Sequence, residues 1–302
     1  MNKVAKKAVA GLTLVLCTAS VLAEQTSNKP DFKVTEVSNG IYMLSGVGGF
    51  VGGNVGLSIG EDGVVMIDDA MPPFLDKMKN AVKSVTNDPI DFLINTHVHG
   101  DHTGNNKSLG EQGVRIVAHE NLRTSMLTKG LKLYGKEGPM PKAALPVITF
   151  SHAMSFHLNG ENARVFHVEN AHTDGDAVIH FENSNVIHTG DTFFNGLFPY
   201  IDLGNGGSVD GYIAAQQEII ALSNNHTKII PGHGPLSNKR ELQTAVDMLI
   251  DSKNIISILI KNGQSEEQVV KTNPLKKYHE NWNWGFITTE KMTRQVYKSL
   301  TK

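Results

Sequence analysis

The chain has 302 residues, with 28 Lys or Arg, 30 Asp or Glu and 1 Cys. This length allows one large domain or two small ones. The slightly acidic charge balance argues against a nucleic-acid partner, which usually requires a basic surface, so the expected partner is a small-molecule substrate.

The first 23 residues have the pattern of a secretory signal peptide. Lys3, Lys6 and Lys7 give a basic start, and the apolar residues 8–23 follow. Small side chains end this stretch before Glu24, as a signal-peptidase cleavage site requires. A membrane anchor is the alternative, but the apolar stretch is too short and no stop-transfer pattern follows it. We expect the mature protein to be periplasmic or secreted, with no membrane span.

Removal of residues 1–23 changes two totals. The mature chain keeps 28 − 3 = 25 basic residues against 30 acidic ones, a formal net charge of −5. It also loses Cys17, the only cysteine, so it has neither thiol nor disulfide. Its 302 − 23 = 279 residues are enough to bury a full core without cross-links.

Strands and helices alternate along the mature chain. The first half predicts strands at residues 41–46, 54–60, 64–69, 90–96 and 114–120, and helices at 72–86 and 120–130. After an irregular stretch at 131–146, the pattern predicts strands at 155–160, 163–170, 177–183, 185–191 and 227–234. Helices are expected at 211–223, 238–263, from 265 onward, and at 288–300.

This order predicts an α/β fold. Two β-rich halves with helices between them favour two sheets packed face to face, with helices on both outer faces, which is a four-layer αββα sandwich. No linker rich in Pro, Gly or Ser divides the chain. We therefore expect residues 24–302 to form a single domain.

Four candidate metal ligands follow the strand at 90–96. His97, His99, Asp101 and His102 form the pattern H-x-H-x-D-H, on what we expect to be a loop at the carboxyl end of that strand. Loops held by a rigid strand commonly carry chemistry. The alternative is a polar surface turn with solvated histidines.

Three more candidates follow later strands. His172, Asp191 and His233 each come after a predicted strand and beside Gly or Thr, which let the backbone approach a metal closely. Singly, each has a structural alternative, such as an ordinary turn residue. Together the seven side chains are too many for one zinc ion, and they suit two if one carboxylate bridges. Nitrogen and oxygen donors fit zinc, and also manganese or iron.

The motifs THVHGDHTGN, AHTDGD, HTGDTF and PGHG, in this order, resemble those of the metallo-β-lactamase superfamily. The resemblance extends from about residue 41 to the helix after His233, and it implies an αββα sandwich with two metals at one edge. It implies first-metal ligands His97, His99 and His172. It implies second-metal ligands Asp101, His102 and His233. It makes Asp191 the bridge, as in the glyoxalase-II-like and lactonase-like branches.

Some branches of that family depart from this set. The commonest subclass of true β-lactamases has a cysteine where Asp191 stands, and the mature chain has no cysteine, so that subclass is excluded. A further β-lactamase subclass keeps H-x-H-x-D-H without the bridging carboxylate and stays open. The flavodiiron branch has a glutamate in place of His99. The mononuclear iron branch stays open as an alternative.

The resemblance implies a hydrolase that uses two Zn²⁺ ions. A hydroxide held between them would attack a carbonyl carbon, and Asp101 would orient it as the catalytic residue. We expect the substrate to be an amide or ester, first of all a β-lactam ring. A lactone, another ester or a thioester is the alternative. An alternative of another class is a secreted metal-binding protein or a mononuclear iron redox protein.

Two segments could shape the substrate pocket. Residues 46–56 are rich in glycine and could form a flap over the site or a wide turn. Phe194, Phe198 and Tyr200 could wall a pocket for an apolar substrate or belong to the core. His188 is expected to support a metal ligand rather than to be one.

Overall fold

The computed structural model describes residues 29–130 and 135–302. The predicted signal peptide, residues 1–23, lies outside the described residues, and so do residues 131–134 of the irregular stretch. Within the described ranges, no helix is long and apolar enough to cross a membrane.

The first sheet contains, in the described part of the chain, seven strands in sequence order. They are β1 (Asp31–Ser38), β2 (Ile41–Val47), β3 (Val55–Gly60), β4 (Gly63–Ile67), β5 (Ile90–Ile94), β6 (Arg115–His119) and β7 (Ile148–Phe150). Strands β1 to β4 pair antiparallel, and β4 to β7 pair parallel. The sequence did not predict β1 or β7, because both lie at sheet edges and bury few side chains.

The second sheet has the order β13-β12-β11-β10-β9-β8. Its strands are β8 (Ala153–Leu158), β9 (Glu161–His167), β10 (Ala177–Phe181), β11 (Val186–His188), β12 (Lys228–Ile230) and β13 (Ser237–Asn238). Only β11 and β12 are parallel among its described pairs. Helix α5 connects these two strands, as a parallel pair requires.

Alternating side chains place the core between the two sheets. On β9, Val165 faces the first sheet while Phe166 packs toward the opposite side, and Ile179 and Val178 divide in the same way on β10. Successive side chains of a strand point to opposite faces, so each sheet has two apolar faces to cover. The inner faces cover each other, and helices cover the outer ones.

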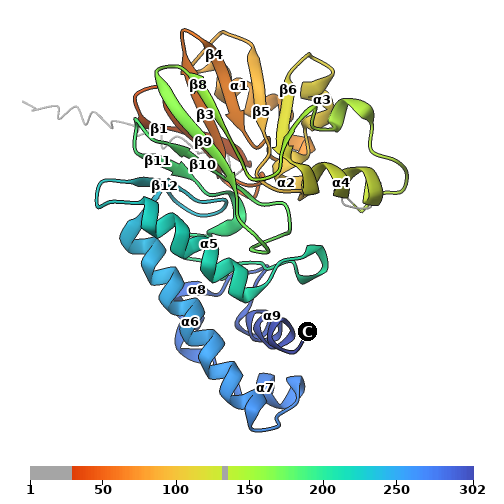
Figure 1. Cartoon of the computed structure of the whole chain (residues 1–302), viewed down its shortest axis with the longest axis vertical. Coiled ribbons are helices and arrows are strands. Elements are labelled where there is room, and N and C mark those ends of the chain that lie inside the picture. Colours follow the sequence, from red (N-terminus) through yellow and green to blue (C-terminus); the bar gives the residue numbers. More distant parts are fainter. Residues whose placement is uncertain (1–28, 131–134) are drawn as a thin grey trace, which may run out of the picture.

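Helices form the two outer layers. The first sheet is covered by α1 (Leu75–Lys83), α3 (Asn106–Gly110) and α4 (Glu120–Lys129), and α2 (Gly100–Thr103) follows β5. The second is covered by α5 (Val209–Leu222), α6 (Lys239–Lys261) and α9 (Thr289–Thr301), with α7 (Glu266–Thr272) and α8 (His279–Trp282) between the last two in sequence. Figure 1 shows α5, α6 and α9 together on the side away from α1 and α4. The predicted αββα sandwich is confirmed.

The candidate ligands all follow strands. They come directly after β5, β9, β11 and β12. One detail of the prediction was wrong: Asp101 and His102 lie on the short helix α2, not on a loop. The backbone turns into this helix right after His99, so three ligands of one motif lie on a strand exit and one turn of helix.

Candidate metal centre

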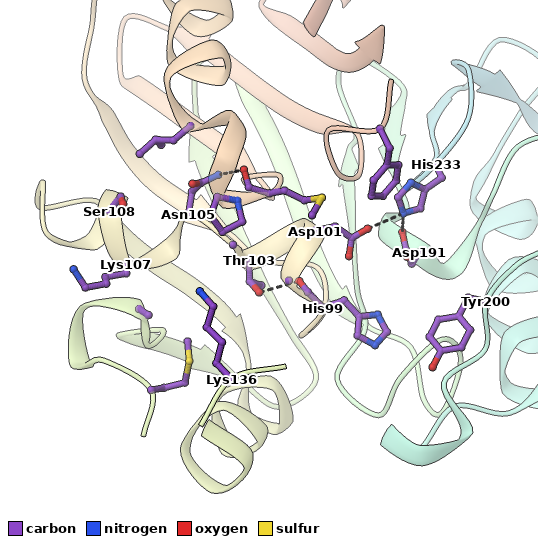
Figure 2. A pocket seen from close by; sticks show the side chains of 18 of the residues that line it. His99, Asp101, Thr103, Asn105, Lys107, Ser108, Lys136, Asp191, Tyr200 and His233 are labelled. Atoms are coloured by element: carbon purple, nitrogen blue, oxygen red, sulfur yellow. Dashed lines mark hydrogen bonds and ion pairs between the residues drawn. The ribbon is translucent and has the colours of Figure 1, made fainter. Parts of the chain in front are cut away.

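The structure brings all seven predicted side chains together. One group contains His97, His99, His172 and Asp191, and another contains Asp101, His102 and His233. Within each group, the ligand atoms lie within 4.8 Å of one another. Figure 2 shows His99, Asp101, Asp191 and His233 at one end of a pocket. Segments up to 136 residues apart (233 − 97) in sequence therefore converge on one edge of the sandwich.

Asp191 lies between the two groups. Its Oδ2 is 3.6 Å from His97 Nε2 and 3.5 Å from His172 Nε2. Its Oδ1 is 3.1 Å from His102 Nε2 and 3.4 Å from His233 Nε2. One carboxylate thus turns one oxygen to each histidine group, which is the geometry of a bridging ligand.

The first group holds its imidazoles in a fixed tautomer. His99 Nε2 donates to Asp202 Oδ2 at 2.9 Å, and His172 Nδ1 donates to the Tyr200 carbonyl at 2.7 Å. Each ring therefore keeps its proton on the nitrogen that points away from the centre. Such outer partners commonly orient the histidine ligands of metals.

The second group depends on Asp68, which the sequence analysis missed. Asp68 Oδ2 accepts from His102 Nδ1 at 2.7 Å and from the Thr96 hydroxyl at 2.7 Å. Asp68 is fully buried at the end of β4, with φ of 59°, a conformation uncommon for a residue with a side chain. A pair of acids directly after a buried strand, Asp68 and Asp69, was the signal in the sequence.

The donor set fits a cation at each group. His99 Nδ1 and His172 Nε2 face each other at 2.8 Å, and in the neutral rings both carry lone pairs because their other nitrogens donate elsewhere. Two acceptors at this distance repel unless a cation lies between or beside them. Buried His97 Nε2 and Asp191 Oδ1 also have no hydrogen-bond partner among the described residues. Buried polar atoms rarely stay unpaired, so these atoms suit metal coordination.

Burial and charge determine the protonation of the ligands. Burial lowers the pKa of His172 to about 4, which leaves its ring neutral. Burial also disfavours charge on Asp101, but His102 and His233 outweigh it and lower the pKa of that carboxyl to about 2. Burial of His233 is outweighed by Asp191 and Asp101, which raise its pKa to about 9 in the absence of metal. Metal binding at the second group must therefore displace a proton from His233.

Two glycines allow this close packing. A Cβ at Gly53 would lie 2.0 Å from the His102 ring, and one at Gly232 would lie 2.0 Å from Asp191 Oδ1. Both distances are far inside van der Waals contact. The glycine-rich segment 46–56 and the PGHG motif thus make room for the ligands.

A cavity of about 1050 Å³ opens from the centre. Of the three predicted wall residues, Phe194 and Tyr200 line it, whereas Phe198 is fully buried in the core beneath the second sheet. The segment 46–56 contributes Phe50, whose ring stacks on His233 at 5.7 Å. Trp284 and Phe286 also line the cavity. The sequence gave no sign of these two, because they lie far from every motif.

Comparisons with known proteins agree with this geometry. Residues 48–233 match the family model of the metallo-beta-lactamase superfamily. A hydroxyacylglutathione hydrolase from Nitrosococcus oceani is 27% identical over 194 residues. That match covers 62% of this chain, and the chain spans only 65% of the relative's length.

Solved structures share the fold. A metallo-beta-lactamase from Pontibacter korlensis superposes with a TM-score of 0.58 at 19% identity, covering 72% of this chain and 99% of that chain. The DIM-1 metallo-beta-lactamase has a TM-score of 0.58 at 16% identity, covering 74% of this chain and 98% of that chain. At such low identity, these likenesses establish the architecture.

Asp202 offers a test of ligand orientation. Asp202→Asn keeps the Oδ1 that accepts from Gly204 and Asn205, but it replaces the carboxylate oxygen that fixes the His99 tautomer. We expect metal affinity about 10- to 100-fold weaker, measured by competition with a chelator. Asp210→Asn, at a mostly exposed carboxylate paired with Lys253, is the matched control and should bind metal as the parent does.

His188 offers a test of pH dependence. Its buried ring donates from Nε2 to the Asn54 carbonyl and accepts at Nδ1 from Gly190 N–H, so only the neutral form fits. Burial lowers its pKa to about 4 from an ordinary value near 6.5. The unfolded chain therefore binds a proton first as pH falls. The stability contributed by neutral His188 is present above pH 6.5 and is lost toward pH 4, at up to about 1.4 kcal/mol per pH unit.

Urea unfolding of the metal-free protein between pH 7 and 4 measures this effect. His188→Gln, which retains a donor and an acceptor, should show a shallower loss of unfolding free energy than the parent. The exposed His226→Gln should follow the parent curve. Parallel curves for the parent and His188→Gln would contradict the assignment.

Proposed function

The chain belongs to the metallo-beta-lactamase superfamily, and on that premise we propose that it is a dinuclear zinc hydrolase of a carboxylic amide or ester. The observation that carries the proposal is the position of Asp191. Its two oxygens face two histidine groups, and each group has further ligands within reach. Nitrogen and oxygen donors without sulfur are compatible with zinc.

The residues would divide the chemistry as follows. His97, His99 and His172 would hold one ion, Asp101, His102 and His233 the other, and Asp191 both. When bound, the two ions supply Lewis acidity, which activates water near neutral pH and polarises a carbonyl group. Asp101 is 24% exposed and lines the cavity, so its carboxylate can accept a hydrogen bond from the attacking water and orient it. Its lowered pKa keeps it ionised for this role.

A β-lactam ring is the proposed substrate. The predicted export of the chain supports it, because β-lactams are met outside the cytoplasm, and the cavity opens widely enough beside the ligands for a bicyclic amide. A thioester or ester, lactones included, is the second candidate. The hydroxyacylglutathione hydrolase that resembles this chain by sequence favours it.

Metal content and turnover test the proposal together. We expect two zinc ions per chain by elemental analysis, and hydrolysis of nitrocefin or of an acyl lactone that stops after chelation and returns with zinc. Hydrolysis of the lactone alone would replace the β-lactam with the second candidate. One iron per chain would instead favour a redox protein, and a metal-free chain would favour a binding role. Activity that survives complete metal removal would refute the mechanism.

We also propose that the protein is exported to the periplasm or beyond. The basic start, the apolar residues 8–23 and the small residues before Glu24 support this location. Amino-terminal sequencing of the full-length chain expressed in a Gram-negative host should begin at Glu24. A protein that keeps Met1 and stays with the cytoplasmic fraction would contradict the proposal.

A further inference from the structure

The segment between α8 and α9 brings aromatic rings to the metal centre. Trp284 and Phe286 line the cavity together with Phe194 and Tyr200. Trp284 and Phe286 lie outside residues 48–233, the part of the chain that matches the family model. This wall is therefore an addition of this chain's carboxyl-terminal region to the edge of the sandwich.

The four rings form a connected corner. Trp284 is 5.6 Å from Phe286 with the planes 69° apart, and 6.2 Å from Phe194. Phe286 is 5.5 Å from Tyr200 at 64°. The corner reaches both ligand groups, because Tyr200 is 5.7 Å from the His99 ring and Trp284 is 6.5 Å from the His233 ring.

Backbone contacts hold this corner in place. Trp284 Nε1 donates to the Phe198 carbonyl at 2.9 Å, and Phe198 N donates to the Trp282 carbonyl at 2.7 Å. Lys291 Nζ donates to the Phe286 carbonyl at 2.8 Å. These bonds connect the segment to the loop that follows Asp191, so the rings are fixed relative to the metal centre.

Phe286 is nevertheless 50% exposed, although it lines the cavity. An exposed phenyl ring forgoes the free energy that burial would provide, and exposed apolar surface beside a pocket commonly marks a binding site. The neighbouring rings in the corner meet edge to face, so a further ring can extend the same packing into the cavity.

We propose that Trp284 and Phe286 bind an aromatic substituent of the substrate and determine its selection, an inference that rests on the proposed hydrolase function. The scissile amide or ester bond lies at the ligands, and the substituent lies against the corner. An aromatic group fits better than a saturated one, because aromatic pairs in edge-to-face or offset geometry gain more than their buried area alone provides.

A matched pair of acyl groups tests this directly. Phenylacetyl and cyclohexylacetyl groups have the same number of carbon atoms and differ in aromaticity. Both are placed on the penicillin nucleus and on ethanol, which covers the two proposed bond classes. For the zinc-loaded full chain, we expect a kcat/KM at least fivefold higher for the phenylacetyl compound, with the difference mainly in KM.

Variants locate the preference. Phe286→Ala and Phe286→Leu should both abolish it, with kcat for the cyclohexylacetyl compound changed by less than about twofold. Leu retains apolar area but has no ring, so a preserved preference in Phe286→Leu would overturn the role of aromatic packing. Ile258→Ala, at a residue that is 58% exposed on α6, is the control and should keep the preference. Equal turnover of the two acyl groups by the parent would also overturn the proposal.

Binding separates this inference from the proposed function. Phenylacetate and cyclohexylacetate share the carboxylate, so the difference in their Kd for the zinc-loaded protein, measured by calorimetry, reports on the wall alone. If no amide or ester is hydrolysed but phenylacetate binds at least fivefold tighter and Phe286→Leu removes this difference, the hydrolase function fails and the aromatic site stands. Equal Kd values would refute the site whatever the enzyme hydrolyses.

Discussion

The buried Asp191 carboxylate, surrounded by imidazoles, is the constraint on which the rest of the site depends. Nitrogens of four histidines lie 3.1–3.6 Å from its oxygens, closer than neutral acceptors and a carboxylate would tolerate without cations or shared protons. Removing such groups from water carries a large cost unless they are paired or coordinated. The surrounding fold therefore has to hold side chains that repel one another in the absence of metal.

The sandwich meets this constraint with rigid supports. Asp68 and Asp202 fix the outer nitrogens of His102 and His99, and Tyr212 on α5 donates its hydroxyl to the Asp191 carbonyl at 2.7 Å. These supports come from β4, from the loop after β11 and from the outer helical layer. Both halves of the molecule thus contribute to the same small volume, and the position of each ligand depends on packing far from it.

Sequence patterns predicted the sandwich and the seven side chains, because each ligand motif is local and follows a strand that periodicity reveals. Asp68 and Asp202 were not predicted, since their roles depend on which ring each meets after folding. Phe194 and Phe198 are both aromatic residues of one loop, yet one lines the cavity and the other fills the core. Only the three-dimensional path of the loop separates them. Edge strands such as β7 bury too little to leave a pattern.

The aromatic corner and the metal ligands lie on different parts of the chain. All seven ligands precede residue 234, while Trp284 and Phe286 belong to a short connection between two helices. Mutations in that connection can alter which molecules bind without touching the groups that activate water. An enzyme arranged in this way can acquire new substrates during evolution at little risk to its catalytic machinery, and the same connection is the natural place to begin its redesign.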